Sequence, residues 1–157
     1  ARQTLDELPE KAGPSTGPLP EAEFFIEPSE ALNRKGEIFA QYKMYKRAIA
    51  MYSLVLRIKP QHLPSMLNTA TTYYNSTNYG KAISILERLL ISHPQHDDII
   101  THHILLAQAY VKSGNRGKGL KNIDIAIKLN PKVKDIIKAN PEFEPLRNMD
   151  EYKNLIK

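Results

Sequence analysis

The chain has 157 residues, of which 41% are apolar, and it carries 22 Lys and Arg against 17 Asp and Glu. This length provides for one domain with a modest hydrophobic core. The sequence contains no cysteine, which excludes disulfides and thiol chemistry, and no apolar run of about eighteen residues, which excludes a membrane-spanning helix within it.

Residues 1–28 are expected to form an acidic, proline-rich, extended arm. They contain six acidic and two basic residues, a net charge of −4, whereas the rest of the chain carries 20 basic and 11 acidic residues, a net charge of +9. Prolines and glycines are concentrated at Gly13–Pro18, and such a composition favours an extended, mobile segment. An acidic arm therefore precedes a basic body.

An apolar triplet, Phe24-Phe25-Ile26, ends this arm directly before the first expected helix. Apolar residues at such a position commonly pack on the helix that follows, so we interpret the triplet as an N-terminal cap on the body. The alternative is that residues 1–23 lie along a partner or fold back toward the basic body.

From residue 29 to residue 131 the sequence repeats itself. The first two units align at a spacing of 34 residues, and the third ends 37 residues after the second, so an insertion lies in the loop at 95–98. Apolar residues recur at intervals of three, four and seven, the period of an amphipathic helix, and a proline closes each unit. A period in the thirties built from two helices predicts a stacked helical array rather than a compact enzyme fold. The matched positions are Gly36/Ala70, Phe39/Tyr73, Tyr45/Tyr79, Ala48/Ala82, Ile49/Ile83, Tyr52/Leu86, Leu56/Leu90 and Pro60/Pro94, with Ala107, Tyr110, Gly119, Ile123, Ile127 and Pro131 in the third unit.

Small residues mark where the two helices of a unit must touch. Gly36 lies mid-way along one helical pattern and Ala48 near the start of the next, and a bulky side chain at either place would push the helices apart. Ser29, just after Pro28, is a plausible N-cap for the first helix.

The three units resemble the tetratricopeptide repeat, a helix–turn–helix unit of 34 residues. The resemblance rests on EALNRKGEIFAQYKMYKRAIAMYSLVLRIKP, on MLNTATTYYNSTNYGKAISILERLLISHP and, more weakly, on HILLAQAYVKSGNRGKGLKNIDIAIKLNP, in which Gly119 and Arg116 replace the usual alanine and tyrosine. It implies an all-α fold: a right-handed superhelical stack of antiparallel helix pairs, with three repeats in 29–131 at about 29–62, 63–96 and 100–133. Residues 132–157 are expected to be capping helices, because terminal repeats need a polar outer face.

The resemblance also implies a partner-binding groove, because the first helix of each pair lines the concave face in this family. Amide and hydroxyl groups there would pair with an extended peptide backbone, and the apolar residues would hold side chains. We therefore expect a non-enzymatic protein–protein interaction scaffold, or an assembly subunit of a larger complex, that binds a partner peptide or helix in this groove. Its lining would be Asn33, Arg34, Glu37, Gln41, Leu67, Asn68, Thr71, Tyr74, Asn75, Ile104, Leu105, Gln108, Val111 and Lys112.

One subfamily of these modules grips the C-terminal carboxylate of heat-shock chaperones with two lysines, two asparagines and an arginine. Of that clamp only Asn68 matches. Asn33 stands in place of the first lysine, and Thr101 and Leu105 occupy the other basic positions. Glu37 replaces an asparagine and would repel a carboxylate. The prediction is that this chain does not bind chaperone tails.

Neither a catalytic site nor a bound cofactor or metal is expected. The glycine-rich stretch at 114–119 follows a helix rather than a strand, so it is interpreted as a turn between helices and not as a phosphate-binding loop. Four histidines lie close in sequence, at positions 93, 96, 102 and 103, but His102 and His103 would point about 100° apart on a helix and cannot face one ion together. No serine–histidine–acid or paired-carboxylate set can be assembled.

Nucleic-acid binding is the alternative function, through basic residues at the turns between helices. Phosphate contacts require such clusters and make affinity fall steeply with salt, whereas groove capture should not depend on salt in this way. The predicted localisation is an organelle interior, such as that of a mitochondrion, because the chain is basic and its first residue is not methionine. The cytoplasm is the other expectation. The clusters are Lys43, Lys46 and Arg47 at the first turn, and Arg116, Lys118 and Lys121 at the third.

Overall fold

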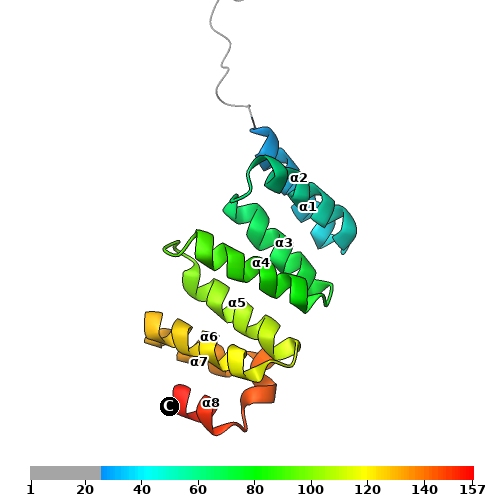
Figure 1. The fold of residues 1–157 in the computed structure, drawn as a ribbon. Coiled ribbons are helices and arrows are strands. Elements are labelled where there is room, and N and C mark those ends of the chain that lie inside the picture. Colours follow the sequence, from blue (N-terminus) through cyan, green and yellow to red (C-terminus); the bar gives the residue numbers. More distant parts are fainter. Residues whose placement is uncertain (1–25) are drawn as a thin grey trace, which may run out of the picture.

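The protein is described from a computed structural model, over residues 26–157. The predictions for the arm at 1–25, including Phe24 and Phe25, lie outside the described residues. Six helices form three antiparallel pairs, and four short elements follow them (Figure 1). The pairs are α1 (Pro28–Gln41) with α2 (Tyr45–Ile58), α3 (Leu63–Asn75) with α4 (Tyr79–Ser92), and α5 (Ile99–Lys112) with α6 (Arg116–Leu129). The short elements are η2 (Pro131–Val133), α7 (Lys134–Ala139), η3 (Pro141–Leu146) and α8 (Asp150–Leu155).

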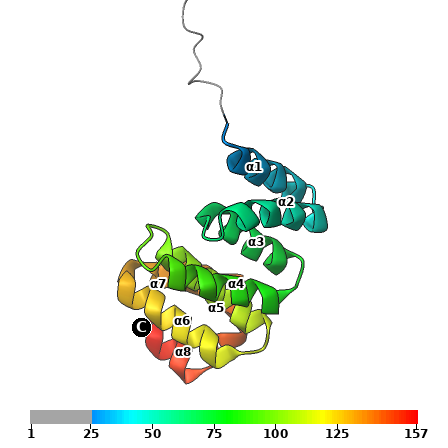
Figure 2. The same ribbon diagram turned by 45° about the horizontal axis from the view of Figure 1, so that its top comes forward.

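The helix pairs stack one after another from the N-terminal to the C-terminal end (Figures 1 and 2). From α1 to α6 each helix packs against the next one in the chain, and no strand occurs between residues 26 and 157. This confirms the predicted all-α stack of helix pairs. None of these helices combines the length and the apolar character that crossing a bilayer requires.

The turn inside each pair has the same conformation in all three repeats. Its central residue has a positive φ: 56° at Lys43, 63° at Thr77 and 88° at Gly114. Backbone N–H groups there bond back to the last turn of the preceding helix, as Lys43 does to Ala40 and Gly114 to Val111. Only the third repeat carries glycine, the residue that adopts this conformation without strain.

Helix starts are secured differently in the three repeats. The side chains of Asn78 and Asn115 accept the backbone N–H of Lys81 and Lys118, which caps α4 and α6. Met44 occupies the corresponding position before α2 and makes no side-chain cap.

The first helix starts two residues earlier than predicted, because its N-cap is Glu27 and not Ser29. Proline suits the first helical position, where its missing N–H is not needed, so α1 begins at Pro28 and Glu27 is the residue before it. Ser29 therefore lies inside the first turn, and its hydroxyl donates to the Glu27 carboxylate over 3.0 Å. Glu27 also pairs with Lys59, over 3.0 Å, and so joins the start of α1 to the end of α2.

Close contact inside the pairs occurs at the small residues, as the sequence predicts. A Cβ added to Gly36 would lie 2.4 Å from Cε1 of Tyr52, and one added to Gly119 would lie 2.7 Å from Cγ2 of Val111. Ala48 is fully buried. The ring of Tyr52 thus packs directly on the backbone of α1.

The elements after α6 close the C-terminal end of the stack (Figure 2). Ile137, Phe143, Leu146 and Tyr152 are buried in one hydrophobic cluster with residues of α5 and α6. The Tyr152 hydroxyl donates to the carbonyl oxygen of Ile137 over 3.3 Å. These short helices therefore cover an apolar surface that the third pair leaves open.

Candidate functional site

Several of the predicted groove residues lie together between α1 and α3. Five of them surround one hollow of about 350 Å³. Its walls are mixed, with amide, hydroxyl and carboxylate groups beside the buried ring of Tyr52. Burial, and then the nearby charge of Glu37, raises the pKa of the Tyr52 hydroxyl to about 12, so it remains a neutral donor. The hollow is lined by Glu37, Ala40, Gln41, Tyr52, Asn68, Thr71, Thr72 and Asn75.

A hydrogen-bond network fixes the carboxylate of Glu37 in this hollow. One carboxylate oxygen accepts from Nδ2 of Asn33 over 2.9 Å and from Nδ2 of Asn68 over 2.8 Å. Oδ1 of Asn33 accepts from the Ser65 hydroxyl over 2.8 Å and from Asn68 over 3.3 Å. Asn33 is only 3% exposed, so it lies beneath the groove surface and positions Glu37 rather than facing a ligand.

Glu37 offers a free acceptor to a ligand. Its side chain is half-buried, and among residues 26–157 no lysine or arginine forms a salt bridge with it. A partly desolvated carboxylate without a cation favours hydrogen-bond donors and positive charge over anions. The chemistry of this hollow is therefore that of a hydrogen-bond acceptor.

The C-terminal end of the groove is already occupied by the chain itself. Glu142 of η3 accepts from the Tyr74 hydroxyl over 2.9 Å and pairs with Lys112 over 2.8 Å. The hydrogen bond from Lys112 lowers the pKa of Glu142, and burial followed by the bond to Glu142 raises the pKa of Tyr74. Two predicted groove residues are thus tied to the C-terminal segment. Sequence reasoning missed Glu142, because its contacts cross 68 residues to Tyr74 and 30 to Lys112 (142 − 112) and no spacing pattern indicates them.

The other predicted groove residues are divided between packing and the surface. Leu67 and Leu105 are partly buried against the cluster around Leu86, and Ile104 packs on the C-terminal cluster. Val111 is buried against Gly119. Gln41 and Asn75 are exposed, Thr71 and Gln108 are half-buried, and the exposed Arg34 pairs with Glu30 over 3.0 Å.

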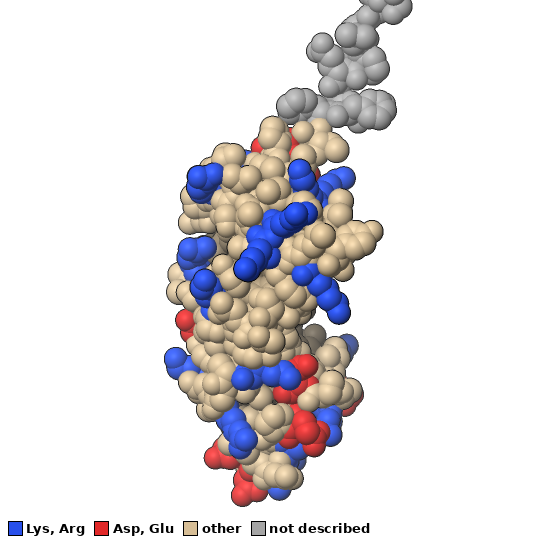
Figure 3. All heavy atoms as spheres, turned by 90° about the vertical axis from the view of Figure 1, so that its right-hand side faces the viewer, with Lys and Arg blue, Asp and Glu red and all other residues tan. Residues whose placement is uncertain are grey.

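Basic side chains collect along the edge formed by the three turns inside the pairs, which Figure 3 shows face on. At each turn a cation lies over an aromatic ring eight residues earlier in the chain. The distances to the ring centroid are 5.8 Å for Arg47 over Phe39, 5.3 Å for Lys81 over Tyr73 and 5.3 Å for Lys118 over Tyr110. These ring faces are thus taken by the protein's own cations, which leaves them poorly placed to stack on nucleic-acid bases.

The structure brings two of the four histidines together. The rings of His96 and His102 stack at 4.4 Å and form a hydrogen bond. Burial, and then the proximity of His96, lowers the pKa of His102 to about 4. His103 points elsewhere and bonds to Asn122 over 2.9 Å. In the described part of the chain no set of three His, Cys, Asp or Glu side chains is arranged to hold a metal ion.

Comparison with known proteins identifies the repeat. Residues 29–62 match the family described as Tetratricopeptide repeat. No sequence match is found among curated proteins.

Three solved structures have similar folds. One is MamA (41-end) from Desulfovibrio magneticus RS-1, with 23% identity and a TM-score of 0.65 over 81% of this chain and 69% of that one. A second is the first TPR of Spaghetti (RPAP3), bound to the HSP90 peptide SRMEEVD, with 16% identity and a TM-score of 0.62 over 82% and 90% of the two chains. A third is the N-terminal domain of stress-induced protein-1 (STI-1) from C. elegans, with 14% identity and a TM-score of 0.63 over 82% and 94%.

These identities are low, so the likeness concerns the fold. It agrees with the stacked helix pairs, with the three equivalent turns and with the family match in the first repeat. The chain therefore contains a tetratricopeptide repeat at residues 29–62 and has the fold of a stack of such repeats.

Proposed function

We propose that this protein is a non-enzymatic scaffold that binds a partner peptide or helix along the inner wall formed by α1, α3 and α5. The observation that carries the proposal is the hollow between α1 and α3, where Glu37 and Asn68 are held in fixed positions and exposed amide groups stand beside them. Preformed, hydrogen-bonded groups bind with less loss of conformational entropy than mobile ones. The family's general role in protein binding supports the same function.

The chemistry of the hollow selects the kind of segment that it binds. Gln41 and Asn75 are exposed and each has both a donor and an acceptor, which suits the N–H and C=O groups of an extended backbone. Glu37 accepts only, so it favours a lysine, an arginine or a free N–H group at this point. Because Glu142 occupies the other end of the groove, the ligand lies mainly across the first two repeats.

We further propose that chaperone tails are not the ligand. The similar RPAP3 domain is bound to the HSP90 peptide SRMEEVD, which ends in acidic residues. In this chain Glu37 would face such a carboxylate, and the buried Asn33 stands where a clamp lysine would be. Titration with SRMEEVD should give no measurable binding. Binding at micromolar affinity that is lost on Asn68→Ala would contradict this proposal.

Site-specific crosslinking tests the groove itself. The sequence has no cysteine, so a photoreactive probe can be attached at a single introduced cysteine, either Asn75→Cys in the hollow or Ser84→Cys on α4 as the control. Both positions are exposed. A partner that binds the inner wall crosslinks from position 75 and not from 84, and the crosslink weakens with Glu37→Gln.

Two results would refute groove binding. Equal crosslinking from both positions would place the partner elsewhere. Crosslinking that disappears steeply with added salt would indicate phosphate contacts and therefore nucleic acid.

A further inference from the structure

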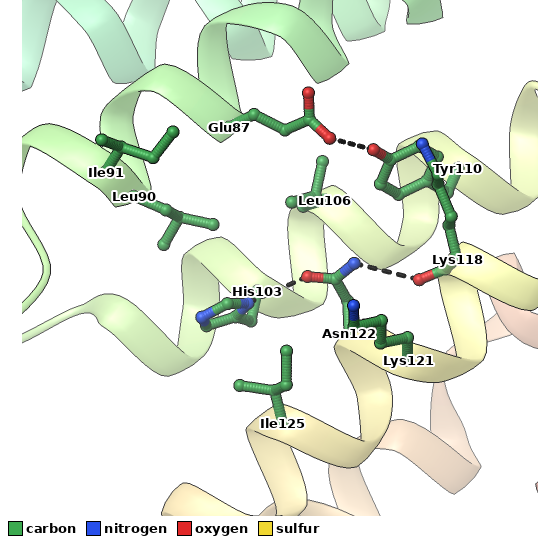
Figure 4. Close-up of a pocket in the computed structure, with 10 residues that line it drawn as sticks. All are labelled: Glu87, Leu90, Ile91, His103, Leu106, Tyr110, Lys118, Lys121, Asn122 and Ile125. Atoms are coloured by element: carbon green, nitrogen blue, oxygen red, sulfur yellow. Dashed lines mark hydrogen bonds between the residues drawn. The ribbon is translucent and has the colours of Figure 1, made fainter.

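A second hollow opens where α4, α5 and α6 meet (Figure 4). It has a volume of about 510 Å³ and lies between α4 and α6, with α5 as its floor. Leu106 and Tyr110 line it, each two residues from Gln108 of the inner wall. Two residues correspond to about 200° around an α-helix. The hollow therefore belongs to the outer surface of the stack, separate from the proposed peptide groove.

The hollow is lined by apolar side chains and bordered by basic ones. Ile91 and Ile125 line it from α4 and α6, and Ile91 is 80% exposed. Lys118 and Lys121 stand on the α6 side (Figure 4), and neither has a salt bridge to any acid within residues 26–157. Glu87 is the acid at the rim, and its carboxylate accepts a hydrogen bond from the Tyr110 hydroxyl.

The apolar character is specific to this junction between repeats. At the preceding junction the positions equivalent to Ile91 and Ile125 are Arg57 and Arg88, at the spacings of 34 and 37 residues that relate the repeats. Two arginines at the preceding junction keep that surface solvated, whereas two isoleucines at this junction expose apolar surface.

The N-terminal arm contains a segment of complementary chemistry. Residues 4–10 read Thr-Leu-Asp-Glu-Leu-Pro-Glu. Its two apolar residues are Leu5 and Leu8. Three acids accompany them, of opposite charge to Lys118 and Lys121 at the rim.

The connecting chain is long enough for this segment to reach the hollow. Between Leu8 and Ile26 it spans 18 residue steps, 26 − 8, or up to about 60 Å when extended. From α1 to α5 there are four steps between packed helices, about 40 Å in total at about 10 Å each. A tether of this length gives an effective concentration far above that of a free peptide.

We propose that residues 4–10 dock into the outer hollow of their own chain, with Leu5 and Leu8 against Ile91 and Ile125 and the acids against Lys118 and Lys121. The docked arm covers the exposed Ile91 and the half-buried Ile125 and neutralises the rim. It leaves the inner wall open, so it does not compete with a peptide in the groove.

Paramagnetic relaxation in the full chain tests this docking. A spin label at Gln3→Cys, in the naturally cysteine-free sequence, should cause loss of the methyl signals of Ile91 and Ile125. Ile38 of α1 is exposed and closer in sequence to the arm, so it serves as the control and should keep its signal. The loss should persist on dilution, because the contact lies within one chain.

Variants of the arm give the matching control. Leu5→Asn with Leu8→Asn leaves the folded body unchanged and should restore both isoleucine signals, and Lys118→Gln with Lys121→Gln should restore them in part. The proposal is overturned if Ile38 loses as much signal as Ile91, or if the leucine variant changes nothing. It is equally overturned if the loss vanishes on dilution, which would indicate docking into a second copy.

Discussion

The contact between Gly36 and Tyr52 makes a quantitative prediction about how helices pair in this protein. A methyl group added by Gly36→Ala would lie 2.4, 2.8 and 2.9 Å from three atoms of the Tyr52 ring. Carbon atoms prefer about 3.5–4.0 Å, so the ring must move by about 1 Å, yet Tyr52 is fully buried and has little room. Such overpacking costs about 1–3 kcal/mol, and the better helix propensity of alanine offsets about 1 kcal/mol. Gly36→Ala is expected to destabilise the first pair by up to about 2 kcal/mol.

The second repeat shows how the same contact is made with other residues. There Ala70 and Leu86 occupy the positions of Gly36 and Tyr52, and both are fully buried. Tyr52→Leu alone leaves a gap beside Gly36 and should also destabilise α1 and α2. The double variant reproduces the pairing of the second repeat, so it should be more stable than the sum of the single effects by about 1–2 kcal/mol.

Native-state hydrogen exchange is the suitable assay, because a terminal repeat contacts a single neighbouring repeat and can open separately. The wild type, the two single variants and the double variant form a double-mutant cycle, and the opening free energy of amides in α1 and α2 is measured for each of the four. The opening free energy of amides in α5 and α6 should remain unchanged in every variant. Additivity of the two substitutions within about 0.5 kcal/mol would refute the reasoning. Such a result would mean that the ring and the glycine do not constrain each other.

Three further predictions concern stability. Met44→Asn supplies the cap that Asn78 and Asn115 provide in the other repeats and should raise the urea midpoint, with a gain of about 1 kcal/mol; an unchanged midpoint would show that α2 does not need this cap. Thr77→Gly removes a β-branched residue from a φ of 63° and should stabilise by up to about 1 kcal/mol; a loss of stability would mean that the Thr77 side chain matters more than its strain. His102, only 2% exposed, has a pKa of about 4 in the folded state against about 6.5 for an unperturbed histidine, so the unfolded chain binds the proton first and stability falls as pH drops from 6.5 toward 4, by up to about 3 kcal/mol. His102→Gln should flatten that part of the pH profile in urea titrations, and an unaltered slope would assign the loss to other groups.

The repeat architecture was predictable because it rests on local patterns. Helix period, closing prolines and the small residues Gly36 and Ala48 are visible in the sequence, and the extra residues before Ile99 fall in the loop between α4 and α5. The positive φ at Lys43 and Thr77 was not predicted, although Gly114 at the matching place in the third repeat was a usable signal. Aligning the turns as well as the helices would have revealed it.

The composition of the inner wall was less predictable, because a repeat pattern assigns positions and not exposure. Asn33 occupies a groove position, yet Ser65, 32 residues later in the chain, draws its amide beneath the surface. Tyr74 is likewise a groove position, but Glu142 engages its hydroxyl from the C-terminal segment. Both outcomes depend on partners in other repeats. Which part of the wall is free of the chain's own contacts therefore depends on contacts between repeats. Under the proposed function, Glu37, which Asn33 and Asn68 hold together, would select the ligand more than the residues that simply face the groove.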